Sequence, residues 1–422
     1  DFQLDLLQKQ AVEETLTKGV VVVTGGPGTG KTTTINLMIR CFEMEKMDIV
    51  LAAPTGRAAK RMTEATGYEA KTIHRLLEVS GGIEDGDSSH FEKNEDNPIE
   101  ADAVILDEMS MVDIHLMYSL LKAIVPGTRL ILVGDSNQLP SVGPGNVLKD
   151  IIDSKAFSVV RLSKIYRQAE SSHIVLNAHK INAGELITLD NKNKDFFFFE
   201  KKDVRSVMGA LVYLVKTRLP EYIGASPFEI QVLTPMRKGE LGVEHLNEVL
   251  QYYLNPASES KKEKEGRTGV FREGDKVMQV KNNYKLEWKI TNAKGFSIEE
   301  GLGVFNGDMG IIKQINTYSE RITVVFDENR EAEYPFSSLD ELELAYAITI
   351  HKSQGSEYPA VVLPLLSGPP ILCNRNLLYT AITRAQKCVA IAGRQSMVEQ
   401  MIHNETEQKR YSGLNDCLKE GL

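Results

Sequence analysis

Hydrophobic positions in the first third of the chain fall into two alternating kinds of run. The first kind is short, uniformly apolar and rich in β-branched residues, as expected of buried strands. It occurs at Val20–Thr24, Asp48–Ala53, Ala103–Asp107 and Arg129–Val133. The second kind has apolar residues at helical spacing, most clearly in Thr32–Glu45 and in the stretch that runs to about Ala65. This alternation predicts a parallel sheet with helices on both faces.

A second alternating region begins near Arg161, and a stretch of different character interrupts it. Strands are predicted at Glu229–Thr234, Ala360–Leu365 and Lys387–Ala392. Between Pro256 and Asp340 the apolar runs are short and are separated by turn residues such as Asn306-Gly307-Asp308. Short strands with turns between them predict a small antiparallel barrel inserted in the second region.

The segment from Gly81 to Asp102 breaks the first alternating pattern. It carries eight acidic residues and one lysine, with Gly81-Gly82, Gly86 and Pro98 as turn signals. One interpretation is a solvated loop. The other is a small β-hairpin inserted in the first domain, over residues 78–102.

Composition narrows the class of protein without naming it. With 42% hydrophobic and 25% charged residues, the chain is neither disordered nor fibrous. The four cysteines form no CxxC pair, which disfavours a structural zinc, an iron–sulfur cluster or a disulfide framework and favours a reducing compartment. No apolar stretch reaches the roughly 18 residues of a membrane helix. The net charge of −9 gives no general support for nucleic-acid binding, which depends instead on whether one groove is basic.

A phosphate-binding loop stands between the first predicted strand and helix. Residues 25–32 read GGPGTGKT and fit GxxxxGK[ST] at every fixed position. The glycines let backbone N–H groups face phosphate oxygens, and the helix N-terminus adds its dipole. We expect Lys31 to reach the β- and γ-phosphates and the Thr32 hydroxyl to bind Mg²⁺. The expected nucleotide contacts of this loop are Gly26, Pro27, Gly28, Thr29, Gly30, Lys31, Thr32 and Thr33.

Two acids, Asp107 and Glu108, follow the predicted strand at 103–107. Beside a phosphate loop, Asp107 is expected to hold Mg²⁺ through water, and Glu108 to orient and deprotonate the attacking water. The alternative role of such acids is to cap the helix that follows. These residues indicate an ATPase or GTPase with a hydrolytic glutamate and leave any further substrate open.

The remaining motifs, taken in order, resemble those of superfamily-one helicases of the RecD type. Residues 4–12 look like the adenine-reading element, 53–59 (APTGRAA) like motif Ia and 72–77 (TIHRLL) like motif Ib. Residues 107–113 (DEMSMVD) match motif II, and 132–143 (LVGDSNQLPSVG) match motif III. Residues 162–168, ending IYRQ, look like motif IV, 349–357 (TIHKSQGSE) like motif V and 379–385 (YTAITRA) like motif VI. The resemblance covers nearly the whole chain.

This resemblance implies roles for individual residues around ATP. Gln8 would read the adenine, Tyr166 would stack on it and Glu357 would meet the ribose. Gln138 would sense the γ-phosphate, while Arg167 and Arg384 would stabilise the transferring phosphoryl group from the second region. A surface ion pair is the ordinary alternative for either arginine.

The resemblance also implies a track for single-stranded DNA along the two sheets. Its residues here are Thr55, Thr72, His74, Thr349 and His351. Hydroxyls and imidazoles suit phosphate contact without sequence preference, although a single Thr or His is often structural. Few lysines and arginines lie in these motifs, which predicts a shallow salt dependence.

The fold class expected is α/β, with two RecA-like P-loop NTPase domains, a β-hairpin insertion in the first and a small β-barrel insertion in the second. The predicted domains are 1–160, 161–255 joined to 341–422, and the barrel at 256–340. Relatives of the long form carry a domain ahead of the residue that corresponds to Gln8, so we expect this chain to be a piece of a longer protein. The stretch Lys285–Gly303 also exceeds the core, and Trp288 and Phe296 there are either a contact surface or barrel packing.

The implied activity is ATP- and Mg²⁺-dependent unwinding of DNA at single-strand/duplex junctions, with 5′→3′ movement on single strands, in repair or recombination. The acidic 81–102 segment would be the pin that splits the duplex. The alternatives are a translocase without unwinding, a relaxase-associated helicase, and a nucleotide-switched binding module. A monomer in the bacterial cytoplasm, away from membranes, is expected.

Overall fold

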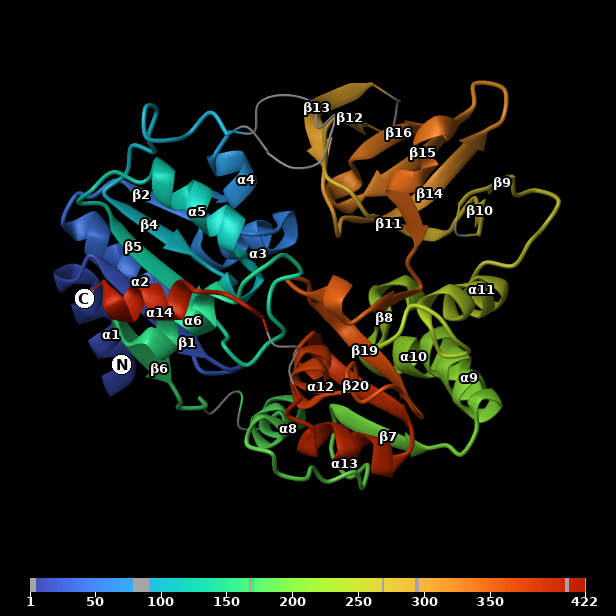
Figure 1. Cartoon of the computed structure of the whole chain (residues 1–422). Coiled ribbons are helices and arrows are strands. Elements are labelled where there is room, and N and C mark those ends of the chain that lie inside the picture. Colours follow the sequence, from blue (N-terminus) through green and yellow to red (C-terminus); the bar gives the residue numbers. More distant parts are fainter. Residues whose placement is uncertain are drawn as a thin grey trace. The chain divides into compact units, whose positions relative to one another are not determined.

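The computed structural model describes residues 5–78, 91–166, 169, 171–267, 269–292, 296–406 and 410–421. The chain divides into two compact units, of which the first comprises residues 1–183 and 407–422 and the second residues 184–406 (Figure 1). The prediction instead assigned 161–183 and 407–422 to the second domain. Residues near 160 belong to the first unit because the strand Ser158–Leu162 pairs in parallel with Val20–Gly25.

The first unit contains a six-stranded parallel sheet, as predicted. Its order is β3 (Ala70–Thr72), β2 (Ile49–Ala53), β4 (Ala103–Leu106), β5 (Arg129–Gly134), β1 (Val20–Gly25) and β6 (Ser158–Leu162). Its helices are α1 (Leu6–Thr17), α2 (Lys31–Met44), α3 (Gly56–Thr66), α4 (Ile73–Leu76), α5 (Ile114–Ala123), α6 (Val147–Ser154), α8 (His173–Asn182) and α14 (Leu414–Glu420). The predicted strands and the predicted helix at 32–45 are confirmed to within a residue or two.

Side chains that alternate along β1 divide the core of this unit between the two faces of the sheet. Val22 packs with the buried residues of α5 and α6, whereas Val21 and Val23 pack with α1 and α2. Leu414 and Leu418 of α14 pack against the α5–α6 side, where Figure 1 shows α14 beside α6. The C-terminal helix therefore packs on the core of the first unit.

The second unit contains a five-stranded parallel sheet of order β18 (Ala347–Thr349), β8 (Ile230–Thr234), β19 (Tyr358–Leu365), β20 (Ala385–Gly393) and β7 (Phe196–Glu200). Its helices are α9 (Val204–Tyr213), α10 (Leu219–Ile223), α11 (Val243–Leu254), α12 (Arg375–Ile382) and α13 (Gln395–His403). The predicted strands β8, β19 and β20 are confirmed.

An antiparallel sheet is inserted in the second unit between α11 and β18, as predicted. Its order is β13 (Ser297–Val304), β12 (Asn283–Thr291), β16 (Glu331–Pro335), β15 (Arg321–Phe326), β14 (Met309–Asn316), β11 (Lys276–Gln279) and β17 (Leu342–Leu344). A separate short hairpin joins β9 (Glu263–Glu265) to β10 (Val270–Arg272).

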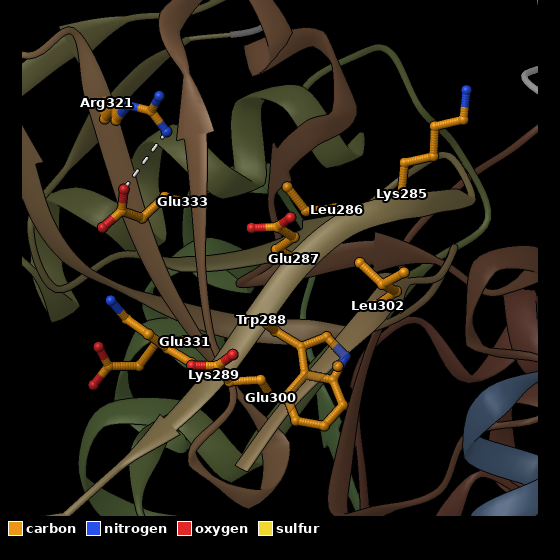
Figure 2. Close-up of a pocket in the computed structure, with 11 residues that line it drawn as sticks. Lys285, Leu286, Glu287, Trp288, Lys289, Glu300, Leu302, Arg321, Glu331 and Glu333 are labelled. Carbon is orange, nitrogen blue, oxygen red and sulfur yellow. Dashed lines mark ion pairs between the residues drawn. The ribbon is translucent and has the colours of Figure 1, made fainter. Parts of the chain in front are cut away.

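Most described residues of the stretch Lys285–Gly303 belong to β12 and β13, which pair antiparallel at one edge of this sheet. Trp288 packs against the core of the unit and lies so close over Gly301 that a Cβ there would be 2.3 Å from the indole. Phe296, in contrast, is 68% exposed. Figure 2 shows the open pocket beside Trp288, which is lined by Lys285, Leu286, Glu287, Trp288, Lys289, Glu300, Gly301, Leu302, Arg321, Glu331 and Glu333. Its three basic and four acidic side chains nearly balance, so the pocket has no strong charge of one sign.

Residues 79–90 of the predicted hairpin at 78–102 lie outside the described residues. Residues 91–102 form a loop that is anchored to the first core: Phe91 packs against it, and Ile99 is 4% exposed. The Ile99 N–H donates to the carbonyl of Ala123 at 2.8 Å. The end of the segment is therefore structural.

Among the helices of the described ranges, none is long and apolar enough to cross a membrane.

Candidate functional site

The phosphate loop connects β1 to α2 at the carboxyl edge of the first sheet. Gly28 and Gly30 have φ of +74° and +80°, in the left-handed region that glycine adopts without strain. The Lys31 ammonium donates to the carbonyls of Gly25 at 2.7 Å and Gly26 at 3.0 Å, so it lies over its own loop. The Thr29 hydroxyl donates to the Gly26 carbonyl at 2.8 Å. A preformed loop with a cation across it is a cradle for phosphates.

Gln8 and Tyr166 both contact this loop, although they are far apart in the sequence of the first unit. The Gln8 amide donates to the Gly30 carbonyl at 3.4 Å, and the Tyr166 N–H donates to the Gly28 carbonyl at 3.2 Å. A Cβ on Gly30 would lie 2.7 Å from Gln8 Nε2 and 2.9 Å from Tyr166 Cε2. An amide and an aromatic ring thus converge beside the phosphate loop, which suits recognition of a base.

The α2 hydroxyls and one unexpected side chain complete this end of the site. Thr32 is exposed and Thr33 half-buried in the first turn of α2. His179 of α8 lies against the loop, with Nε2 3.1 Å from the Pro27 carbonyl oxygen. His179 belongs to none of the recognised motifs, so its contact with the loop was not predicted.

Asp107 and Glu108 follow β4 at the same edge of the sheet. The Glu108 N–H donates to Asp107 Oδ1 at 2.7 Å, and Glu108 has a left-handed backbone with φ of 55°. Burial first, and then the neighbouring Glu108 carboxylate, raises the pKa of Asp107 to about 6. A buried pair of adjacent carboxylates favours a nearby cation.

Glu108 forms an ion pair with Arg61 of α3. This contact was not predicted. Arg61 lies just beyond motif Ia, and its sequence position does not indicate that its side chain reaches the end of β4. Helical spacing identifies the face that carries Arg61 but not the residue that it meets.

Gln138 lies in the loop after β5 and is 9% exposed, with a buried Oε1 atom that has no hydrogen-bond partner in the described part of the chain. The hydroxyl of Thr24 at the end of β1 accepts from the Ser136 N–H at 3.2 Å, which ties this loop to the strand before the phosphate loop. Further along the same loop, Arg410 donates to the carbonyls of Ser141, Gly143 and Gly145. No motif pointed to Arg410, which is 265 positions or more from its partners.

The three threonines of the expected DNA track share one structural device. Thr55 and Thr72 are the N-caps of α3 and α4, accepting backbone N–H groups at 3.2 and 3.1 Å. Thr349 accepts from the Lys352 N–H at 3.3 Å. Each residue follows or ends a parallel strand, and Ala53 and Thr72 are paired across β2 and β3. A capping hydroxyl uses its lone pairs and keeps its O–H free to donate, so the structural role and a phosphate contact are compatible.

The two histidines of the expected DNA track lie in different surroundings. Burial lowers the pKa of His74, so its imidazole is neutral at pH 7 and would contact phosphate as a dipole. Its ring is tilted against Phe91 with centroids 6.0 Å apart. His351 begins the short 3₁₀ turn His351–Ser353 in the second unit and is half-buried.

The remaining predicted residues come from the second region of the sequence. Arg167 lies outside the described residues. Arg384 is buried in the second unit, donating to the carbonyls of Thr380 and Ser356 at 3.3 and 3.2 Å. Glu357 is exposed and accepts from Gln386 at 3.3 Å. Their roles at the nucleotide stay predictions.

Three domain families match the chain in an order that follows the fold. Residues 8–144 match the AAA domain, residues 246–326 the SH3 domain of ATP-dependent RecD-like DNA helicases, and residues 344–392 the UvrD-like helicase C-terminal domain. The SH3 match begins within α11 and covers much of the antiparallel sheet.

Two curated relatives are similar over most of this chain. The ATP-dependent RecD2 DNA helicase of Deinococcus radiodurans is 37% identical over 89% of this chain and 47% of its own length. The RecBCD enzyme subunit RecD of Mycolicibacterium smegmatis is 31% identical over 98% of this chain and 74% of its own length. The chain thus spans about half of the first relative and about three quarters of the second.

Solved structures of Pif1 helicases share the fold. The Bacteroides protein bound to single-stranded DNA has a TM-score of 0.52 at 18% identity, over 95% of this chain and 94% of that one. A Pif1 structure that addresses unwinding of forked duplex DNA has a TM-score of 0.54 at 20% identity, with the same coverage.

The phosphate loop, the paired acids and the two parallel sheets define a P-loop nucleoside triphosphatase with two α/β domains. The identity and coverage of the RecD relatives identify it further. The chain belongs to the RecD-type family of superfamily-one DNA helicases, which are ATP-hydrolysing enzymes.

Proposed function

We propose that this chain hydrolyses ATP in order to move along single-stranded DNA in the 5′→3′ direction and to separate duplexes at single-strand/duplex junctions. The observation that carries the proposal is the convergence of Gln8, Tyr166, Lys31 and Glu108 at one sheet edge, which also bears the capping hydroxyls of Thr55 and Thr72. The name of the Deinococcus relative and the single-stranded DNA bound in the Bacteroides Pif1 structure support it.

The donor set at this edge fits Mg²⁺ bound together with ATP. Thr32 and Asp107 would hold the ion, whose charge would offset that of the phosphates. Burial and then the neighbouring Glu108 carboxylate raise the pKa of Asp107, and a divalent cation bound there would offset both effects. Lys31 would hold the β- and γ-phosphates, Glu108 would accept the proton of the attacking water, and Gln138 would contact the γ-phosphate.

Two measurements test the function together. ATP hydrolysis is measured with and without single-stranded DNA, and unwinding is measured on partial duplexes that carry either a 5′ or a 3′ tail. Stimulation by DNA with unwinding from the 5′ tail alone is the expected result. Stimulation without unwinding would indicate a translocase. Hydrolysis that does not respond to DNA would indicate a nucleotide switch and would contradict the proposed DNA contacts.

Replacing residues 81–90 with a short Gly/Ser turn is expected to abolish unwinding and to leave DNA-stimulated ATP hydrolysis intact, because a pin acts on the duplex and not on ATP. The replacement stops before Phe91, since Phe91 and Ile99 pack on the core and their loss would destabilise the domain. A matched control exchanges the exposed Asn97 for Ser in the anchored loop. Unwinding at the parental rate by the replaced chain would contradict the pin assignment.

The affinity for Mg²⁺–ATP is expected to fall as the pH is lowered from about 7 to about 5, because Asp107 takes up a proton near pH 6 and a neutral carboxyl binds Mg²⁺ poorly. The folded pKa is raised above the ordinary 3.8, so in the metal-free protein the contribution of Asp107 to stability is present below pH 3.8 and is lost as the pH rises through about 6. Titrations of Mg²⁺–ATP binding and of thermal unfolding check both slopes. Asp107→Asn should remove the contribution of this carboxyl to the pH dependence of Mg²⁺–ATP binding and of stability. An unchanged pH profile in that variant would assign the pH dependence to other groups.

A further inference from the structure

We infer that Arg61 is a brake on ATP hydrolysis: without DNA it holds Glu108 away from the phosphates, and DNA bound at the start of α3 releases it. The inference rests on the proposed function, since it takes Glu108 as the acceptor of the water proton and Thr55 as a DNA contact. It gives a role to a residue that has none in the proposed function, and it explains how DNA binding would control ATP hydrolysis.

The ion pair between Arg61 and Glu108 is shielded mainly on the carboxylate side. The Glu108 side chain is 10% exposed, so water competes weakly for its carboxylate, whereas the Arg61 side chain is 31% exposed. Arg61 Nη2 donates to Glu108 Oε1, which engages one of the two carboxylate oxygens. A charge-assisted contact of this kind is stronger than a contact between neutral groups.

The strand order shows from which parts of the sheet the two partners of this ion pair come. Glu108 follows β4, and β2 lies on one side of β4 while β5 and then β1 lie on the other. The phosphate loop follows β1, whereas α3, which carries Arg61, packs over β2 and β3. Helix α3 also packs against α2, which begins at the phosphate loop, so what keeps Glu108 from a water beside the γ-phosphate is the ion pair that occupies its Oε1 atom. For Glu108 to reach a water beside the γ-phosphate, the ion pair must open.

Helix α3 connects this ion pair to the expected DNA track. Its N-cap is Thr55, and Arg61 follows six positions later, roughly 9 Å along the axis at 1.5 Å per residue. A phosphate at Thr55 would meet the positive end of the helix dipole and act on α3 as a unit.

The packing of α3 permits such a movement. Its buried residues are Ala58, Ala59 and Met62, and the two alanines pack with Ala53 and Ala70 in a small cluster of their own. Met62 packs with Ile35, Met38, Ile39 and Phe42 of α2 in the main core on this face, whereas the two alanines bury little apolar area, so the end of α3 near Thr55 is less firmly packed than the turn that carries Met62.

Arg61→Gln in the full chain tests the brake. Glutamine keeps a polar side chain and removes the charge that holds Glu108. We expect ATP turnover without DNA to rise about tenfold, the rate change that corresponds to 1.36 kcal/mol, and the stimulation by single-stranded DNA to shrink by a similar factor. A purely structural role for Arg61 would instead lower both rates together.

Lys60→Gln is the matched control, because Lys60 is the preceding residue of α3 and forms an ion pair with Glu64 at 3.9 Å. It should leave both rates near the parental values. If Arg61→Gln does not fold, as thermal unfolding would reveal, Arg61→Lys provides the test. Lysine keeps the charge without the planar fork, so DNA-free turnover should rise by a smaller factor.

Unchanged or reduced turnover without DNA in Arg61→Gln, or in Arg61→Lys where that variant is the one tested, would overturn the brake. Failure of the proposed function has a different signature, since the parental chain itself would then show no stimulation by DNA. The double variant Arg61→Gln/Glu108→Gln should hydrolyse ATP as slowly as Glu108→Gln. Fast hydrolysis by the double variant would overturn the brake, because release of Glu108 is what it requires.

Discussion

Lys31→Ala abolishes ATP hydrolysis, with turnover reduced by about 1,000-fold or more, if the phosphate loop works as its geometry indicates. A fixed donor aimed at developing charge contributes about 100- to 1,000-fold to a rate, and Lys31 also supplies a full positive charge. In the structure its ammonium already lies over the carbonyls of Gly25 and Gly26, so little rearrangement is needed when phosphates arrive. Alanine leaves the backbone N–H groups of the loop in place, so weakened binding of ATP can be separated from lost turnover.

The measurement for Lys31→Ala is steady-state ATP hydrolysis at saturating single-stranded DNA, with nucleotide binding followed in parallel. Lys18→Ala is a suitable control, because Lys18 is an exposed lysine at the end of α1 and belongs to no motif. Unwinding should disappear together with hydrolysis. Turnover within about tenfold of the parental chain would show that the charge of Lys31 is dispensable and would remove it from the mechanism.

Glu108→Gln is expected to bind ATP normally and to turn it over at least about 100-fold more slowly, because loss of a general base typically costs about 100- to 10,000-fold. Glutamine has nearly the same shape as glutamate but does not accept the proton of water. Asp107 remains available to Mg²⁺, so the affinity for Mg²⁺–ATP should stay close to that of the parental chain.

Binding of a fluorescent ATP analogue and single-turnover hydrolysis separate these two effects of Glu108→Gln. Glu64→Gln is the matched control, since Glu64 is an exposed acid on α3. Near-normal turnover in Glu108→Gln would exclude Glu108 as the base. A loss of ATP binding as large as the loss of turnover would instead assign Glu108 to binding.

The local elements of both parallel sheets were predictable from sequence for a simple physical reason. Strands buried on both faces need uninterrupted apolar runs, and a phosphate loop needs glycines at fixed spacing before a helix. The runs that became β1, β2, β4 and β5 therefore stand out, as does the loop from Gly25 to Lys31. The same reasoning placed Asp107, Glu108 and Gln138 at strand ends.

Domain membership was less predictable, because it depends on pairing between distant segments. Residues 161–183 were predicted to begin the second domain, yet β6, which ends at Leu162, pairs with β1. The terminal helix α14 looked like the end of the second domain, yet Leu414 and Leu418 pack on the first core. The sequence of a short apolar run does not show which sheet the strand will join, since any parallel edge offers the same backbone hydrogen bonds.

By itself the sequence determined the class of chemistry, because phosphate binding and magnesium chemistry require particular residue types at fixed local spacings. It also determined the order of the motifs and hence the family. Only the tertiary structure decided which side chains from distant segments meet these motifs: Arg61 at Glu108, His179 at Pro27, and Arg410 at the loop after Gln138. The physical reason is that a long charged side chain pairs with whatever packing brings within its reach, and packing is a property of the whole fold.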